Sequence, residues 1–256
     1  MMIRFRPTAL ALSAAVALSA TTAQAQTFYG DDTNGSSTRR AGSVGTTAAR
    51  ASFLDRLGAN AMTEDFERFA DGTRPPLALL FTGSGMATLN AAGRIGEIEM
   101  DGRRATDGFG RYSNSAVKFY ETTSTNRART TFTIDFSRTV GAFGFVGIDI
   151  GDFGSQLSLA FLRDGTEVFT YALPYTATDG TNSGRDGSRL FAGFAARNPG
   201  QNFDRVEFRG TDSDDVFAFD DMTVAPAVVP EPATVTLMGG GLLALAGVAA
   251  RRRRSA

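Results

Sequence analysis

The chain has 256 residues and contains no cysteine, no histidine and no tryptophan. Without cysteine and histidine it cannot build a Ser-His-Asp triad, a Cys-His dyad or a zinc site of the usual ligands. Disulfides are excluded as well, so the fold must be held together by its hydrophobic core or by a bound metal. No G-x-S-x-G, P-loop or H-E-x-x-H motif occurs. Catalysis by paired carboxylates, as in glycosidases, is the enzymatic chemistry that the composition leaves open.

The C-terminal end combines three features in a fixed order. They are a short polar motif, an uncharged apolar segment and a basic cluster, at Pro230-Glu231-Pro232, 233–250, and Arg251, Arg252, Arg253 and Arg254. A membrane-spanning helix needs about 20 apolar residues, with ~17 as the lower limit, so segment 233–250 just suffices. The arginines would hold the end of this helix on the cytoplasmic side, which places the rest of the chain across the membrane.

This order of features resembles the PEP-CTERM sorting signal of Gram-negative bacteria that export extracellular polysaccharide. The resemblance implies that an exosortase-type protease cuts near the Pro-Glu-Pro motif while the precursor is transiently held in the inner membrane. An ordinary single-span anchor is the alternative, but Gly239, Gly240 and Gly241 weaken the helix, since each glycine costs roughly 1 kcal/mol relative to alanine. We therefore expect an inner-membrane-anchored precursor that becomes a cell-surface or extracellular protein.

The N-terminal end has the pattern of a secretory signal peptide. Arg4 and Arg6 form its positive region, segment 9–20 is its apolar core, and Ala23 and Ala25 form an A-x-A cleavage site. We predict that residues 1–25 are removed before Gln26. The apolar core is too short for a stable membrane span, which argues against an uncleaved anchor.

The mature protein is predicted to be acidic. The two terminal segments, 1–25 and 230–256, contain six arginines and one glutamate, so their removal takes the net charge from −1 to −6. A negative surface repels polyanions, which argues against nucleic acid as a partner.

The remaining sequence predicts an all-β fold, a jelly-roll β-sandwich over 61–226, after a flexible leader with one short helix at 26–60 and before the sorting signal at 227–256. The helix is expected at 47–57, ended by Gly58. Short runs rich in Phe, Val, Ile and Thr, separated by Gly and Asp, predict strands. These are expected at 63–69, 77–82, 86–90, 94–100, 115–121, 129–136, 140–150, 155–163, 166–173, 189–196, 203–209 and 215–224. Asp164-Gly165 predicts a type I′ turn between two of them.

Three acidic clusters interrupt the strands, at 64–67, 149–152 and 212–221. The segments EDFE, GFVGIDIGDFG and FAFDDMTV resemble recurring marks of PEP-CTERM proteins whose domain is similar to galactose-binding-like and carbohydrate-binding-module jelly rolls. That resemblance implies a structural Ca²⁺ where the first and last strands meet, with Glu67, Asp220 and Asp221 as ligands. We interpret the acids at 149–152 and 212–215 as solvated strand ends and turn formers. Segment 179–190 imitates a calcium loop but ends in Leu190, where a bidentate glutamate is required.

Two classes of function fit this sequence. The first is a non-catalytic structural or glycan-binding protein of the cell envelope or of an extracellular (biofilm) matrix, with extracellular polysaccharide as its partner. The second is a carboxylate-dependent glycan hydrolase or lyase. Sugar platforms favour tryptophan, which is absent, so the rings with a polar group are those of four tyrosines in the domain, Tyr112, Tyr120, Tyr171 and Tyr175. We favour the non-catalytic class.

Overall fold

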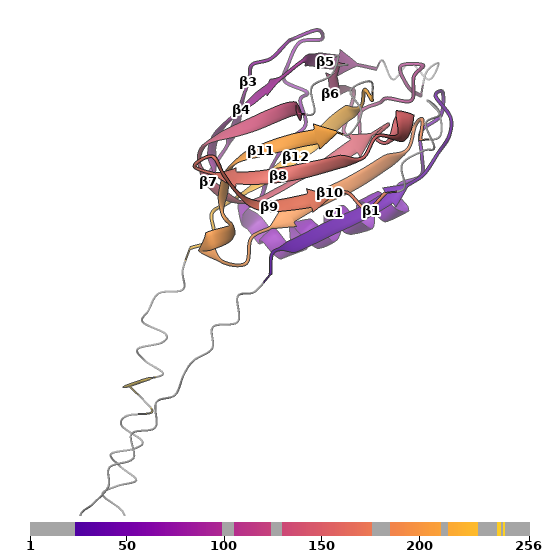
Figure 1. Cartoon of the computed structure of the whole chain (residues 1–256). Helices are drawn as coiled ribbons and strands as arrows, with labels where there is room; N and C mark the ends of the chain where they lie inside the picture. Colours follow the sequence, from indigo (N-terminus) through magenta and orange to yellow (C-terminus); the bar gives the residue numbers. More distant parts are fainter. Residues whose placement is uncertain are drawn as a thin grey trace, which may run out of the picture.

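The computed structural model describes residues 24–98, 105–123, 130–175, 185–210 and 215–229, together with Gly240, Gly241 and Leu243. In this part of the chain, antiparallel strands stack in two layers and α1 (Val44–Leu57) covers one outer face (Figure 1). The strands are β1 (Gln26–Asp32), β2 (Met62–Glu64), β3 (Leu77–Phe81), β4 (Gly85–Ala91), β5 (Gly93–Glu97), β6 (Lys118–Thr122), β7 (Thr130–Ile148), β8 (Leu157–Arg163), β9 (Thr166–Ala172), β10 (Arg189–Ala195), β11 (Phe203–Gly210) and β12 (Ala218–Pro226). Short 3₁₀ turns lie at 58–60, 152–154 and 199–201.

The long strand β7 belongs to both layers. Its first part pairs with β4 and β11, and its last part pairs with β10 and β12. Phe203 of β11 pairs with Val140 of β7, but Arg205 pairs with Asp135, so β7 has more residues than β11 between these two pairs. The extra residues form a bulge that bends β7. The two strands predicted at 129–136 and 140–150 are therefore one continuous strand.

The two layers enclose a phenylalanine-rich core. One layer has the order β3-β4-β7-β11-β8-β9 and the other the order β1-β10-β7-β12-β6-β5, with β2 also beside β12. Rings from different layers meet directly: the centroids of Phe161 in β8 and Phe194 in β10 lie 4.3 Å apart, and those of Phe145 and Phe208 lie 5.1 Å apart. The predicted β-sandwich and the aromatic composition of its core are confirmed.

The predicted hairpin is present with the expected turn. β8 and β9 are joined by Asp164 and Gly165, whose φ angles of 50° and 76° are both positive, as a type I′ turn requires.

The N-terminal segment differs from the sequence-based prediction. Residues 26–32 are not a flexible leader but form β1, which pairs with β10 along its whole length, for example Phe28 with Gly193. An edge strand is held by backbone pairing and buries few side chains. The sequence of β1 is therefore poor in apolar residues and does not show the pattern that predicts a strand. The predicted helix is confirmed, and it begins three residues earlier, at Val44.

α1 is attached to the sandwich mainly through Phe53, which is fully buried. Its ring lies against Gly144 of β7 and Gly193 of β10, where an added Cβ would be only 2.7 and 2.9 Å from the ring. The rings of Phe28 and Phe191 each lie 5.3 Å from it. The two glycines thus form a recess in the sheet that one phenylalanine fills, and residues 26–60 are part of the folded domain.

Both predicted targeting segments fall largely outside the described residues. Of the signal peptide only Gln24 and Ala25 are described, so Ala23 and both arginines of its positive region are outside. Of the predicted span only Gly240, Gly241 and Leu243 are described, and the Pro-Glu-Pro motif and the arginine cluster lie outside as well. Among the described residues, no helix has the length and apolarity needed to cross a membrane.

Candidate functional site

Four aspartates from three separate segments converge at one end of the second layer. Asp149 and Asp152 directly follow β7, Asp186 precedes β10, and Asp215 precedes β12. Strands β10 and β12 flank β7 in antiparallel register, and both Arg189 and Ala218 pair with Ile148. The residues that follow the end of β7 therefore lie beside the residues that precede β10 and β12.

The loop after β7 is sharply folded. Asp149, Gly151 and Phe153 have φ angles of 67°, 107° and 55°, a left-handed conformation that is uncommon for residues other than glycine. The backbone N–H of Gly151 donates to Asp215 Oδ2 at 3.0 Å, and that of Arg185 donates to Asp152 Oδ1 at 3.1 Å. These bonds connect the loop to the other two acidic segments.

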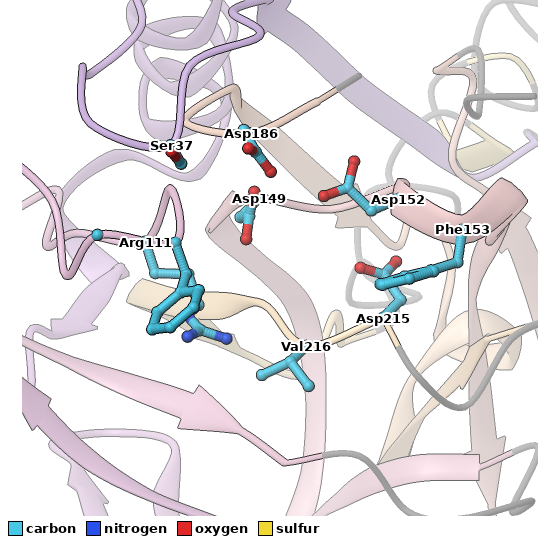
Figure 2. Close-up of a pocket in the computed structure, with 10 residues that line it drawn as sticks. Ser37, Arg111, Asp149, Asp152, Phe153, Asp186, Asp215 and Val216 are labelled. Atoms are coloured by element: carbon cyan, nitrogen blue, oxygen red, sulfur yellow. The ribbon is translucent and has the colours of Figure 1, made fainter. Parts of the chain in front are cut away.

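The aspartates line a cavity of about 380 Å³, which Figure 2 shows with its surrounding side chains. Phe109 and Phe153 also line it, and their side chains are 68% and 40% exposed. Ser37, Arg111 and Val216 complete much of the wall. The cavity therefore combines an acidic floor with two aromatic rings that are accessible to solvent.

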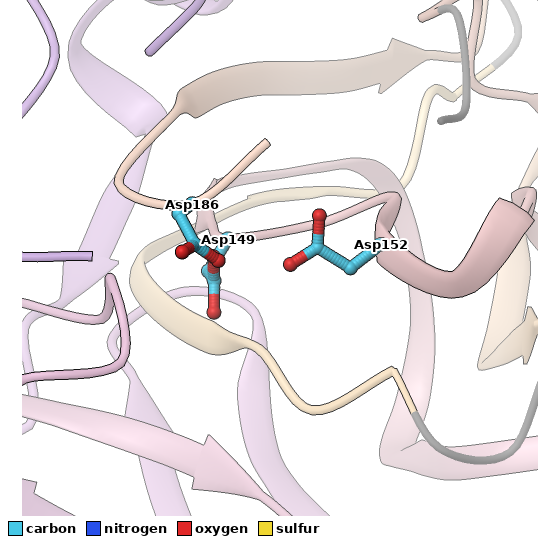
Figure 3. A group of neighbouring side chains, drawn as sticks. All are labelled: Asp149, Asp152 and Asp186. Atoms are coloured by element: carbon cyan, nitrogen blue, oxygen red, sulfur yellow. The ribbon is translucent and has the colours of Figure 1, made fainter. Parts of the chain in front are cut away.

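The acidic floor is compact and poorly compensated. One carboxylate oxygen from each of Asp149, Asp152 and Asp186 lies within 4.8 Å of those from the other two (Figure 3). Burial, and next the charge of Asp152, raise the pKa of the Asp149 carboxyl to about 9. Burial likewise raises the pKa of Asp215 to about 7 and that of Asp152 to about 6. A buried carboxylate without a compensating positive charge is costly in its ionised form.

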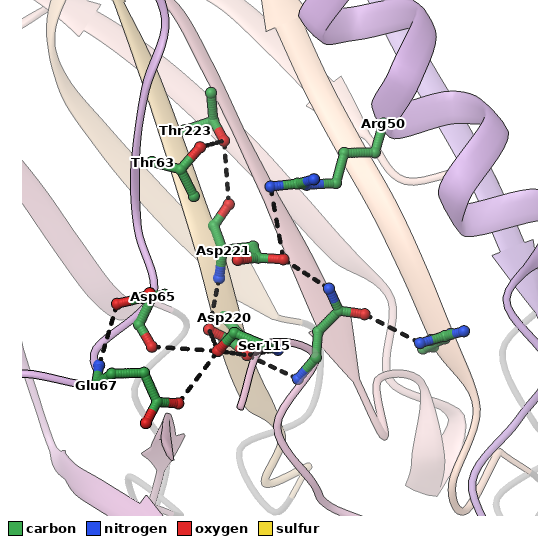
Figure 4. Close-up of polar contacts among 10 residues, drawn as sticks. Arg50, Thr63, Asp65, Glu67, Ser115, Asp220, Asp221 and Thr223 are labelled. Atoms are coloured by element: carbon green, nitrogen blue, oxygen red, sulfur yellow. Dashed lines mark hydrogen bonds and ion pairs between the residues drawn. The ribbon is translucent and has the colours of Figure 1, made fainter. Parts of the chain in front are cut away.

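The acids predicted from the sequence as calcium ligands lie elsewhere, around segment 113–118 (Figure 4). Glu67 Oε1 accepts hydrogen bonds from the backbone N–H groups of Val117 and Lys118, at 2.8 and 2.7 Å. Asp220 Oδ2 accepts from the N–H groups of Asn114 and Ser115, at 2.7 and 2.9 Å.

Asp221 completes this arrangement from a bulge in β12, where its φ angle is 50°. Its Oδ2 accepts from Asn114 Nδ2 at 2.6 Å and lies 3.6 Å from Arg50 Nη2. The expected meeting of the first and last predicted strands occurs, because Glu64 of β2 pairs with Met222 of β12. The carboxylates are engaged with N–H donors that attach segment 113–118 to the sheet. The calcium site expected at Glu67, Asp220 and Asp221 stays a prediction.

The tyrosines that we considered for sugar contacts are mostly in the interior. Tyr112 and Tyr120 are 0% exposed and Tyr175 is 5% exposed, while Tyr171 is partly buried. The hydroxyls of Tyr112 and Tyr175 donate to the backbone carbonyls of Gly187 and Ser155. The accessible aromatic rings beside the acids are instead phenylalanines, which the sequence did not single out.

Taken with the fold, the C-terminus defines the class of protein: an exported β-sandwich protein with a sorting signal. Residues 228–254 match the family model of the PEP-CTERM protein-sorting motif. The chain therefore carries a PEP-CTERM sorting motif, which implies exosortase processing and an exported precursor that passes the membrane. No curated protein matches the sequence.

Several solved structures are distantly similar to this chain. The K2 cleaved adhesin domain of Lys-gingipain is 16% identical with a TM-score of 0.38, and the similarity covers 66% of this chain and 99% of that domain. The C-terminal family 22 carbohydrate binding module of Clostridium thermocellum Xyn10B is 15% identical with a TM-score of 0.36, covering 66% and 95%. A DUF4465 family protein from Bacteroides caccae is 12% identical with a TM-score of 0.35, covering 65% and 99%. Likenesses this distant assign no ligand to the chain.

Proposed function

We propose that this protein is an exported, non-catalytic glycan-binding module of the cell surface or extracellular matrix, built on a jelly-roll sandwich. The observation that carries the proposal is the cavity in which Phe109 and Phe153 accompany the four aspartates. Ligand pockets of about 300–1,000 Å³ with aromatic walls and a few polar groups are typical small-molecule sites. A sugar ring has apolar C–H faces that an aromatic ring can cover, and hydroxyl groups at its edge.

The polar part of the cavity complements those hydroxyls. A carboxyl group accepts hydrogen bonds and, in its protonated form, can also donate one, and a sugar hydroxyl can do both. Arg111, whose guanidinium lies 5.4 Å from the centre of the Phe109 ring, lines the same wall and has further N–H donors besides those paired with Asp107 and Glu121. The cavity therefore has aromatic rings for the apolar C–H faces of a sugar and polar groups for its hydroxyls.

The spacing of the acids is compatible with hydrolysis as well as with binding. Glycosidases place two carboxyl groups on either side of the scissile bond, ~5–5.5 Å apart in retaining and ~6.5–9.5 Å apart in inverting enzymes. Here the oxygens of Asp149, Asp152 and Asp186 gather within 4.8 Å of one another on one floor. A glycan hydrolase or lyase is the alternative that the experiment below must exclude.

The mature fragment 26–229 is a suitable reagent, because it contains every strand described above, the phenylalanine-rich core between the layers and the recess filled by Phe53. We expect it to bind extracellular polysaccharide from the producing cells, and members of a glycan array, without releasing reducing ends. The double variant Phe109→Ala/Phe153→Ala should bind at least about tenfold more weakly, since each lost ring contact contributes ~0.5–1.5 kcal/mol beyond its buried area.

Leu80→Ala is the matched control, because Leu80 is a large side chain in β3 that is 62% exposed and does not line the cavity. It should bind as tightly as the unmodified fragment. Release of reducing sugars would favour the enzyme, and equal binding by the double variant would place the ligand at another surface.

A further inference from the structure

We propose that the floor of this cavity is a divalent-cation site, in which Asp149, Asp152, Asp186 and Asp215 supply carboxylate oxygens to Ca²⁺. The site differs from the calcium site expected at Glu67, Asp220 and Asp221, and it does not depend on the protein's binding a glycan.

The spacing of the oxygens fits calcium. Ca²⁺ takes six to eight oxygen ligands at 2.3–2.6 Å, so two ligands on opposite sides of the ion lie up to about 5 Å apart. The oxygens of Asp149, Asp152 and Asp186 lie within 4.8 Å of one another, which is inside this limit. Mg²⁺ binds at 2.0–2.1 Å, which allows at most about 4.2 Å, and it usually retains several waters. An all-carboxylate set of this size therefore favours Ca²⁺.

Two of the carboxylate oxygens have no partner within the protein. Oδ1 of Asp149 and Oδ1 of Asp215 are buried and accept no hydrogen bond from the described part of the chain. The two residues are only 4% and 5% exposed, and both line the cavity, into which Figure 2 shows their carboxylates pointing. Buried polar atoms are nearly always hydrogen-bonded or bound to an ion or water, so an ion or a water belongs beside each of these atoms.

The nearby arginines are engaged with other carboxylates. Arg111 Nε lies 2.8 Å from Asp107 Oδ2, and its Nη2 lies 3.2 Å from Glu121 Oε1. Arg185 Nη2 lies 3.3 Å from Asp31 Oδ2. Their charges are thus divided between these outer acids and the group of four. A divalent cation would supply the positive charge that four clustered carboxylates require.

The surrounding backbone leaves room for the Asp149 carboxylate. A Cβ on Gly110 would lie 2.7 Å from Asp149 Oδ1, so only glycine permits the loop of residues 105–111 to pass so close. The side of the group that faces the cavity remains open. We infer that waters or ligand oxygens complete the coordination from there.

The test uses the mature fragment with CaCl₂ as the probe, in calorimetric titration and in thermal unfolding against EDTA. A ligand at ~100 times its Kd stabilises the folded state by about 2.7 kcal/mol, which for a domain of this size corresponds to a rise in Tm of roughly 5–10 °C. We expect that rise in the unmodified fragment. Asp149→Asn should abolish it, together with the heat of binding, while its Tm in EDTA should equal or exceed that of the unmodified fragment. The reason is that the variant keeps the shape of the side chain and removes a carboxyl group whose burial is costly.

Asp135→Asn is the matched control, because Asp135 lies in β7 outside the cavity and belongs to neither of the two expected calcium sites. It should retain the calcium-dependent rise in Tm. The proposal is overturned if the unmodified fragment shows neither heat nor a Tm change in calcium. It is equally overturned if Asp149→Asn responds normally, and loss of the response in an Asp221→Asn variant instead would move the ion to the site expected from the sequence.

Discussion

Protein recovered from the producing cells is expected to begin at Gln26 and to end near the Pro230-Glu231-Pro232 motif, without the arginine tail. The sorting motif at 228–254 implies exosortase processing, and the A-x-A site predicts signal-peptide cleavage. Because proteolytic cleavage is irreversible, we expect nearly all of the recovered protein to have lost both ends. Intact-mass spectrometry of the recovered protein measures both ends at once.

Replacing the Pro-Glu-Pro motif with three alanines should leave an unprocessed precursor in the membrane fraction that keeps Arg251 to Arg254. Pro174→Ala, which changes an exposed proline of the sandwich, should be processed normally. A mature form that retains an intact C-terminus would show instead that the segment is a permanent anchor.

The second large effect concerns residues 26–60, which the sequence alone predicts to be a flexible leader with one short helix. A fragment of residues 61–229 should fail to give a cooperative unfolding transition. It lacks β1, which pairs along β10, and α1, whose Phe53 fills the recess at Gly144 and Gly193. Thermal and urea unfolding of fragments 61–229 and 26–229 make the comparison.

A single substitution tests the contribution of Phe53 packing without deleting segment 26–60. Phe53→Ala should lower the free energy of unfolding of fragment 26–229 by about 3–5 kcal/mol, the usual cost of removing a buried aromatic side chain. Ser52→Ala, one residue earlier on the exposed side of the helix, should change it by no more than ~0.5 kcal/mol. If fragment 61–229 and Phe53→Ala were as stable as fragment 26–229, segment 26–60 would be a leader after all.

Features that depend on neighbouring residues could be predicted from the sequence. The Asp164-Gly165 turn is the clearest case, since a type I′ turn needs two residues that tolerate positive φ. The run of Phe, Ile and Thr at 129–136 likewise located the first part of β7. The sorting signal was recognisable because its parts follow one another directly.

Features that depend on strand pairing could not be predicted in this way. Asp149, Asp186 and Asp215 meet only because β10 and β12 both flank β7, and nothing local in the sequence specifies that order. Each acid does lie next to a strand end, and this was the available signal. We interpreted it as solvation, whereas Asp149 and Asp215 are buried. β1 was missed for a related reason, because its stability comes from its partner strand.

The central claim is that the cavity between segments 105–111 and 149–155 holds a glycan, and hydrogen exchange tests it most directly. The mature fragment is compared with and without extracellular polysaccharide from the producing cells, in the presence of calcium. We predict slower exchange in peptides from those two segments, and no change in the β3–β4 hairpin, which lies outside the cavity. Unchanged exchange at 105–111 and 149–155, with protection elsewhere or nowhere, would contradict the account.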